Sequence, residues 1–153
     1  MAVYSSDGDI ENLIFIIANL PEFLKASVCK TKIKELIEMS ESDKKETMIR
    51  SLSSLNLVDE HKLLDLTKTW MKVISEIAPD NLTQILHCYL LTLNSVKLFD
   101  KVNPKLILDI FSSLEETQKN KLMVCLREAL FLNPNRDQVL KNIPSTLTKV
   151  ILN

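Results

Sequence analysis

The sequence predicts an all-α protein, built as a right-handed stack of antiparallel helical hairpins. Apolar residues recur with a period of 37 residues between Ile33 and Leu130, and such a period is typical of stacked repeats, here a fragment of about seven to nine helices. The 153 residues include one glycine. Glycine supplies the positive-φ positions of tight hairpins and phosphate-binding loops, so its near absence disfavours a many-stranded sheet and a nucleotide cradle.

Six positions of the predicted repeat are apolar in all three copies. They are Ile33/Trp70/Ile107, Leu36/Val73/Ile110, Ile37/Ile74/Phe111, Met48/Ile85/Leu122, Ile49/Leu86/Met123 and Leu52/Tyr89/Leu126. The first three fall in the first helix of each hairpin and the last three in the second helix. The alternative, a compact helical bundle, requires this period to arise by chance from helices of similar length, so the stack is favoured.

The chain reads as a single all-helical domain, 1–153. A polar lead-in (1–9) precedes N-terminal helices (10–32). Three hairpins of about 37 residues follow over 33–132, and capping helices over 133–153 cover the open end of the stack.

Apolar spacing and helix-boundary residues predict nine helices. Their expected ranges are Ile10–Ala18, Glu22–Met39, Lys44–Leu55, Glu60–Ile77, Leu82–Leu93, Lys105–Leu114, Thr117–Leu132, Arg136–Ile143 and Pro144–Leu152. The second of these is expected to break near Lys30–Thr31, where the apolar rhythm slips.

Prolines and capping residues mark where these helices begin. Pro21 and Pro104 suit the first helical position, where a missing N–H costs nothing. The run Ser40–Asp43 is typical of a capping box. Pro79 ends the helix before it and places the next start at Asp80 or Asn81.

The repeats resemble the HEAT and armadillo class of helical pairs on the apolar spacing of Ile33–Leu130 alone. The proline and aspartate that sometimes mark the turn within a unit of that class appear in one copy, at Pro79–Asp80. That resemblance implies an extended interaction surface formed by stacked helices. Helical pairs of similar length also occur in organellar RNA-binding repeat proteins, which Ile77–Asn81 and the helix after it broadly resemble.

The histidines and cysteines do not form a metal motif. His61 and His87 are far apart in the sequence, and no short-spaced ligand pair is present, so no metal site is expected. Cys29, Cys88 and Cys125 lie in apolar helical contexts and are interpreted as buried, reduced thiols.

No catalytic constellation is found, and no enzymatic activity or cofactor is expected. The serines and threonines do not lie in a glycine-flanked nucleophile elbow. Acidic pairs such as Asp59–Glu60 and Glu115–Glu116 fall at expected helix starts, where negative charge favours the helix dipole.

The charge balance makes nucleic acid an unlikely partner. Nineteen basic and twenty acidic residues give a net charge of −1, whereas nucleic-acid-binding domains usually carry a basic excess. An alternative function is RNA binding through the locally basic Lys30–Arg50 region of a larger repeat array. The sequence lacks a secretory leader and an apolar run long enough to span a membrane, so an intracellular protein, cytoplasmic or nuclear, is expected.

The leading hypothesis is a non-enzymatic scaffold or adaptor that binds another protein. The outward positions of the second helices change from polar in the first copy to apolar in the later copies. The candidate partner-binding residues there are His87, Leu90, Leu91, Val124 and Arg127. Two explanations stay open: cover by the terminal segment Leu147–Leu152 or by the first helix, or docking of a partner's apolar helix, including that of a second copy.

Overall fold

The computed structural model describes residues 7–93 and 95–153, and within them the chain forms ten α-helices, one 3₁₀ turn and no strand. The helices are α1 (Asp7–Ala18), α2 (Glu22–Glu38), α3 (Glu41–Ser53), α4 (Glu60–Ile74), α5 (Pro79–Thr92), α6 (Leu98–Lys101), α7 (Pro104–Ser112), α8 (Glu116–Leu132), α9 (Arg136–Lys141) and α10 (Ser145–Leu152). The 3₁₀ turn η1 is Leu55–Leu57. The all-α prediction is confirmed.

Several helix starts follow the predicted boundary chemistry. The Ser40 hydroxyl accepts a hydrogen bond of 3.1 Å from the Asp43 N–H, so α3 begins at Glu41, earlier than expected. Pro104 occupies the first helical position of α7, as expected. Pro79 is itself the first residue of α5, rather than preceding a start at Asp80 or Asn81, and Pro21 is the N-cap residue of α2 rather than its first helical residue. The Asn103 side chain accepts a bond of 2.9 Å from the Lys105 N–H and caps α7.

Three local predictions are wrong. Helix α2 runs without a break through Lys30–Thr31, because Cys29 and Ile33 carry its buried stripe across that point. Helix α4 ends at Ile74 rather than Ile77, where the hydroxyl of Ser75 donates to the carbonyl of Lys72. Helix α1 begins at Asp7, inside the expected polar lead-in, of which residues 1–6 lie outside the described part of the chain.

Helix α6 is the element that the sequence pattern does not reveal. It has four residues, too few for a periodic apolar stripe. Buried Val96 and Val102 lie just before and just after it and anchor it to the core. With α6 added to the nine expected helices, the described residues contain ten, of which eight have seven residues or more.

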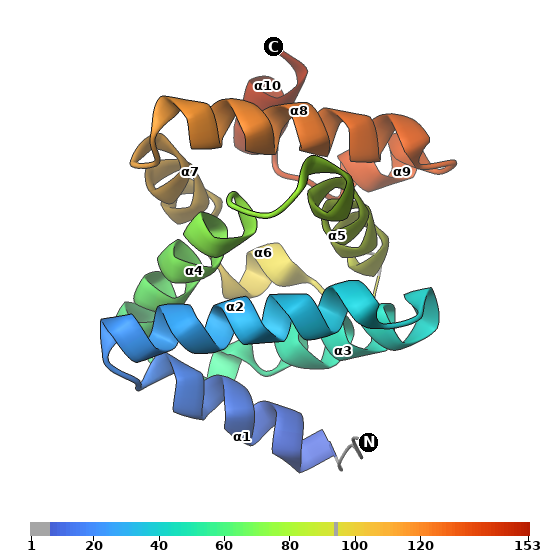
Figure 1. The fold of residues 1–153 in the computed structure, drawn as a ribbon. Coiled ribbons are helices and arrows are strands. Elements are labelled where there is room, and N and C mark those ends of the chain that lie inside the picture. The colour runs from blue at the N-terminus through green and yellow to red at the C-terminus, as the bar shows by residue number, and fades with distance from the viewer. Residues whose placement is uncertain (1–6, 94) are drawn as a thin grey trace.

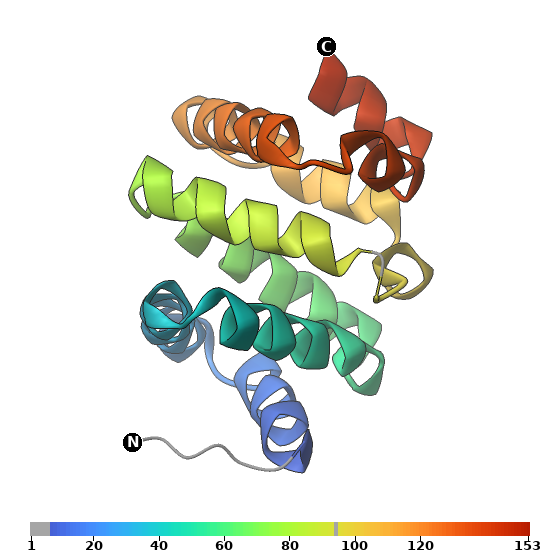
Figure 2. The same cartoon turned by 90° about the vertical axis from the view of Figure 1, so that its right-hand side faces the viewer.

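The elements follow one another from one end of the molecule to the other, with α1 at one end and α9 and α10 at the opposite end (Figures 1 and 2). Helix α2 packs against α4, and α4 against α7. Helix α3 packs against α5, and α5 against α8. Helix α1 contacts α2, α3 and α4, whereas α10 contacts α7 and α8.

Residues one period apart have matching burial at four of the six predicted repeat positions. The matched sets are Leu36/Val73/Ile110 and Met48/Ile85/Leu122, which are buried, and Ile49/Leu86/Met123 and Leu52/Tyr89/Leu126, which are partly buried. The predicted inward face of the helices is therefore the observed one at these positions.

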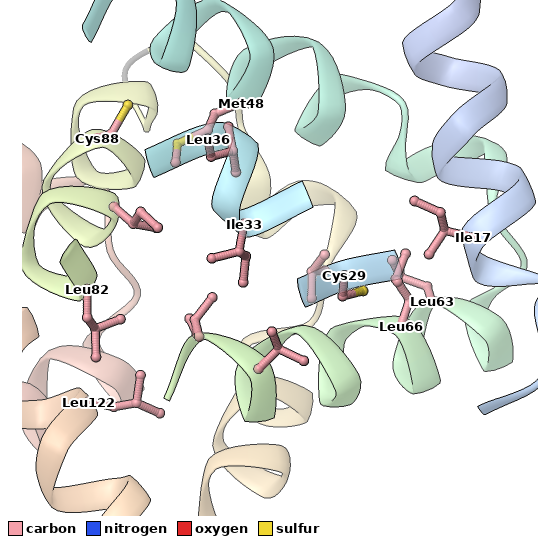
Figure 3. Packing of buried hydrophobic residues seen from close by; sticks show 14 of the residues in the cluster. Ile17, Cys29, Ile33, Leu36, Met48, Leu63, Leu66, Leu82, Cys88 and Leu122 are labelled. Carbon is pink, nitrogen blue, oxygen red and sulfur yellow. The ribbon is translucent and has the colours of Figure 1, made fainter. Parts of the chain in front are cut away.

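The core consists of two clusters of buried side chains. The larger cluster extends from Ile17 on α1 to Cys125 on α8, and Figure 3 shows Leu82 of α5 and Leu122 of α8 facing each other within it. The smaller cluster comprises Leu90, Ala129, Leu130, Val139, Ile143, Leu147 and Ile151. Partly buried Leu86 and Ile107 pack against both clusters and connect them.

Candidate functional site

Leu90, one of the five candidate partner-binding residues, is buried inside the molecule. Its side chain is 5% exposed and belongs to the smaller cluster, together with Leu147 and Ile151 of α10. Leu90 is therefore buried within the molecule, in a cluster that also contains residues of α8, α9 and α10. His87 and Leu91, on the same helix α5, are partly buried.

Val124 and Arg127 lie on α8 and are exposed. The Val124 side chain is 60% exposed. The Arg127 Nε donates a hydrogen bond of 2.8 Å to the carbonyl oxygen of Ile151. This bond connects α8 to the last turn of α10, where a positive side chain also favours the helix dipole. The structure thus places the five candidates in different environments, of which only the α8 pair is exposed.

The sequence reasoning missed Phe131, which is 74% exposed on α8. It follows Val124 by seven residues, so the two side chains lie on the same side of the helix, two turns apart. Arg127 and Glu128, both exposed, lie between them. Together these four residues form what we call the α8 outer face. The seven-residue spacing between Val124 and Phe131 is the sequence signal by which Phe131 could have been found.

A second group of exposed apolar residues lies near the opposite end of the molecule. Phe15 and Ile16 are exposed on α1, and Phe23 and Leu24 are exposed at the start of α2. Phe23 is 74% exposed, the same fraction as Phe131. The described residues therefore offer two apolar regions at separate ends, with a phenylalanine of equal exposure in each.

The basic region considered for RNA presents fewer free cations than its sequence suggests. Lys44 is buried, and the Lys32 ammonium lies 3.1 Å from a Glu35 carboxylate oxygen. Lys30 and Lys34 are exposed on α2. A buried lysine and a lysine paired with a carboxylate contribute little to phosphate binding, so this arrangement does not favour the RNA alternative.

The three cysteines are buried free thiols, as the sequence indicated. Burial raises the pKa of Cys29 to about 11 and also raises the pKa of Cys88, against the opposing effect of Lys44. The Cys125 thiol lies 3.7 Å from the carbonyl oxygen of Pro79 and donates to it. A thiol with a raised pKa is a poor nucleophile and a poor metal ligand.

The described side chains include no group of three or more His, Cys, Asp or Glu residues able to hold a metal ion. Likewise, none of the helices in residues 7–93 and 95–153 is long and apolar enough to cross a membrane.

A cavity of about 900 Å³ that is partly open to solvent lies between the helices. Its walls come from every α-helix except α9, and most of the lining side chains are aliphatic or aromatic. At one end it is bordered by Ile10 of α1 and at the other by Leu147 and Ile151 of α10. It therefore extends along the molecule between the two ends seen in Figure 2.

Trp70 and Tyr89 place polar atoms in this mostly apolar lining. Burial raises the pKa of Tyr89, and the neighbouring indole of Trp70 opposes part of that rise. The Trp70 Nε1 is buried without a hydrogen-bond acceptor among the described residues. The cavity thus contains a buried donor that lacks a partner within this part of the chain.

Comparison of the chain with protein-family models, with curated proteins and with solved structures finds no match. The HEAT- and armadillo-like resemblance accordingly stays a prediction drawn from spacing.

Proposed function

We propose that the chain is a non-enzymatic helical-repeat scaffold that binds another protein through the α8 outer face. The observation that carries the proposal is the exposure of Phe131 and Val124 on one side of α8. Large exposed aromatic side chains next to arginine are enriched at protein interfaces and often dominate their binding energy.

The packing of equivalent helices supports the scaffold part of the proposal. If the hairpins are α2–α3, α4–α5 and α7–α8, the first helices contact one another in order and so do the second helices. Contacts between equivalent helices of neighbouring units are a feature of HEAT- and armadillo-type stacks. Matching burial one period apart, as at Met48, Ile85 and Leu122, fits the same arrangement.

The α8 outer face favours a partner that presents an apolar helix. Val124 and Phe131 are two turns apart, the spacing at which an amphipathic helix places its anchors. Arg127 and Glu128 supply one positive and one negative charge between them, which suits a partner with a mixed polar rim. A second copy of this chain offers the same face and is included among such partners.

The test compares two phenylalanines of equal exposure at opposite ends of the molecule. A photo-crosslinking amino acid replaces Val124, and the crosslinked products from cells are identified by mass spectrometry. The Phe131→Glu change is expected to abolish the main product, because it places a charge in the apolar contact. The Phe23→Glu change is the matched control and is expected to leave the product unchanged.

Equal product from both variants, with helical content intact by circular dichroism, would contradict the proposal. Sedimentation velocity of the purified chain distinguishes self-association from binding to another protein. In the first case the wild-type chain sediments as a dimer and the Phe131→Glu variant as a monomer.

A further inference from the structure

We propose that the internal cavity is a binding site for a neutral lipid, namely a single aliphatic chain with one oxygen-bearing head group. This inference concerns the interior of the molecule and is independent of the α8 outer face.

The size of the cavity suits a small-molecule ligand. A cavity of about 900 Å³ lies in the range of small-molecule sites, about 300–1,000 Å³. An apolar ligand bound there would remove the apolar lining from water and make dispersion contacts with it.

The lining indicates an apolar and elongated occupant. Leu13 and Ile14 line the cavity on α1, Phe111 lines it on α7, and Leu126 lines it on α8. These helices belong to opposite ends of the molecule (Figure 1). Water gains too few hydrogen bonds to fill a cavity lined in this way. A chain-like hydrocarbon matches both the length and the chemistry of the lining.

The Trp70 indole indicates an oxygen on the ligand. Its Nε1 is buried on the cavity wall with no acceptor among the described residues, and the side chain of Tyr89 lines the wall beside it. A buried donor without an acceptor is costly, typically by the full desolvation penalty of the group. A hydroxyl or carbonyl oxygen of the ligand would satisfy this donor.

The charges where α2 and α3 line the cavity favour a neutral head group. Exposed Glu35, Asp43 and Glu46 line this end, which identifies it as the opening to solvent, and Lys32 and Arg50 line it as well. Lys32 is already paired with Glu35. An anionic ligand would have to lose its hydration in an apolar cavity, which costs much more than burying a hydroxyl.

The sole tryptophan of the chain makes binding directly measurable. The purified full-length chain is titrated with 1-dodecanol while the emission of Trp70 is recorded. A saturable shift with one dodecanol bound per chain is expected. Dodecanoate at pH 8 has the same chain length and a charged head, and we expect it to bind at least tenfold more weakly.

Two adjacent residues of α8 provide a matched pair of variants. Met123 lines the cavity, and its neighbour Val124 is exposed and does not. The Met123→Glu change should weaken dodecanol binding at least tenfold, because it places a charge in the apolar lining, and Val124→Glu should leave binding unchanged. Leu126→Gln, at another lining position, is a milder polar variant for the case in which Met123→Glu fails to fold.

The role of the indole is tested by calorimetry on Trp70→Phe, which keeps an aromatic ring at this position and removes the Nε1–H donor. We expect dodecanol affinity to fall about fivefold, the worth of one net hydrogen bond. The proposal is overturned if dodecanol does not bind, or if Met123→Glu and Val124→Glu bind it equally. Binding of dodecanoate as tight as that of dodecanol would overturn the neutral head group, and unchanged affinity in Trp70→Phe would overturn the role of the indole.

Discussion

The Thr69 hydroxyl on α4 donates a hydrogen bond of 2.8 Å to a carboxylate oxygen of Glu22, the first residue of α2. The two residues are 47 positions apart in the sequence. Glu22 also lies 3.6 Å from the ammonium of Lys25, whose side chain is buried. Glu22 therefore joins the start of α2 to the middle of the helix that packs against it.

Replacing Thr69 with valine should lower the free energy of unfolding by about 1 kcal/mol, the usual net worth of one hydrogen bond. Valine keeps the shape of the side chain, and Glu22 stays hydrated because it is exposed. Urea denaturation measures the change. Thr67→Val is the control, because the Thr67 hydroxyl bonds to the Leu63 carbonyl within its own helix. A larger loss of unfolding free energy in Thr67→Val than in Thr69→Val would contradict the prediction.

Truncating Ile85 should be among the most damaging single changes in the chain. Its side chain is fully buried, at 0% exposure, in the larger cluster. Ile85→Ala is expected to cost about 2–5 kcal/mol of unfolding free energy, because it removes apolar contacts and leaves a cavity. Leu57→Ala, at an exposed position of η1, should change stability by less than about 0.5 kcal/mol in the same thermal or urea melts. Similar losses at both positions would show that the observed burial does not govern stability.

The hydrogen bond from Arg127 to Ile151 should hold α10 against α8. Arg127→Gln is expected to raise amide hydrogen exchange in residues 145–152 about tenfold, since a bond from a charged donor is worth about 1.5 kcal/mol or more. Exchange in α5 should stay close to that of the wild type. Lys121→Gln, also on α8, removes a positive charge without touching this bond and is the control in the same mass-spectrometric experiment. If amide hydrogen exchange in residues 145–152 is the same in Arg127→Gln and Lys121→Gln, the hydrogen bond from Arg127 does not anchor α10.

The buried thiol of Cys29 should make stability fall at alkaline pH. Burial raises its pKa from 9.0 to about 11, so above pH 9 the unfolded chain loses this proton while the folded chain keeps it. The contribution is therefore complete below pH 9 and is lost as the pH rises from 9 to 11, by about 1.4 kcal/mol per pH unit for one proton.

Urea melts at pH 8, 9 and 10 measure this dependence, and Cys29→Ala should flatten it by the slope of one group. Cys88 also has a raised pKa and accounts for part of the slope that remains. An unchanged slope in Cys29→Ala would refute the assignment.

Helix positions and inward faces were largely predictable because they depend on neighbours close in sequence. The stripes through Met48, Ile85 and Leu122 repeat every 37 residues, and all three side chains are buried. Helix α6 escaped prediction because four residues carry no periodic signal. The expected break at Lys30–Thr31 does not exist, since packing of Cys29 and Ile33 outweighs a local slip in the apolar rhythm.

The candidate site was only partly predictable, for a different reason. Leu90 and Val124 are both apolar residues at outward positions of the predicted stripe. In the folded chain Leu90 is buried in a cluster with residues of α8, α9 and α10, whereas Val124 is exposed. The difference depends on where a distant helix packs, and periodicity along one helix does not contain that information.

The sequence by itself determined that the chain is helical, where most helices begin, and which side of each faces inward, because propensity, capping and apolar spacing act over a few residues. The tertiary structure alone decided which apolar faces are covered and where the interior leaves a cavity beside Trp70 and Tyr89. Burial and packing depend on contacts between segments far apart in the chain, and only the folded arrangement brings those segments together.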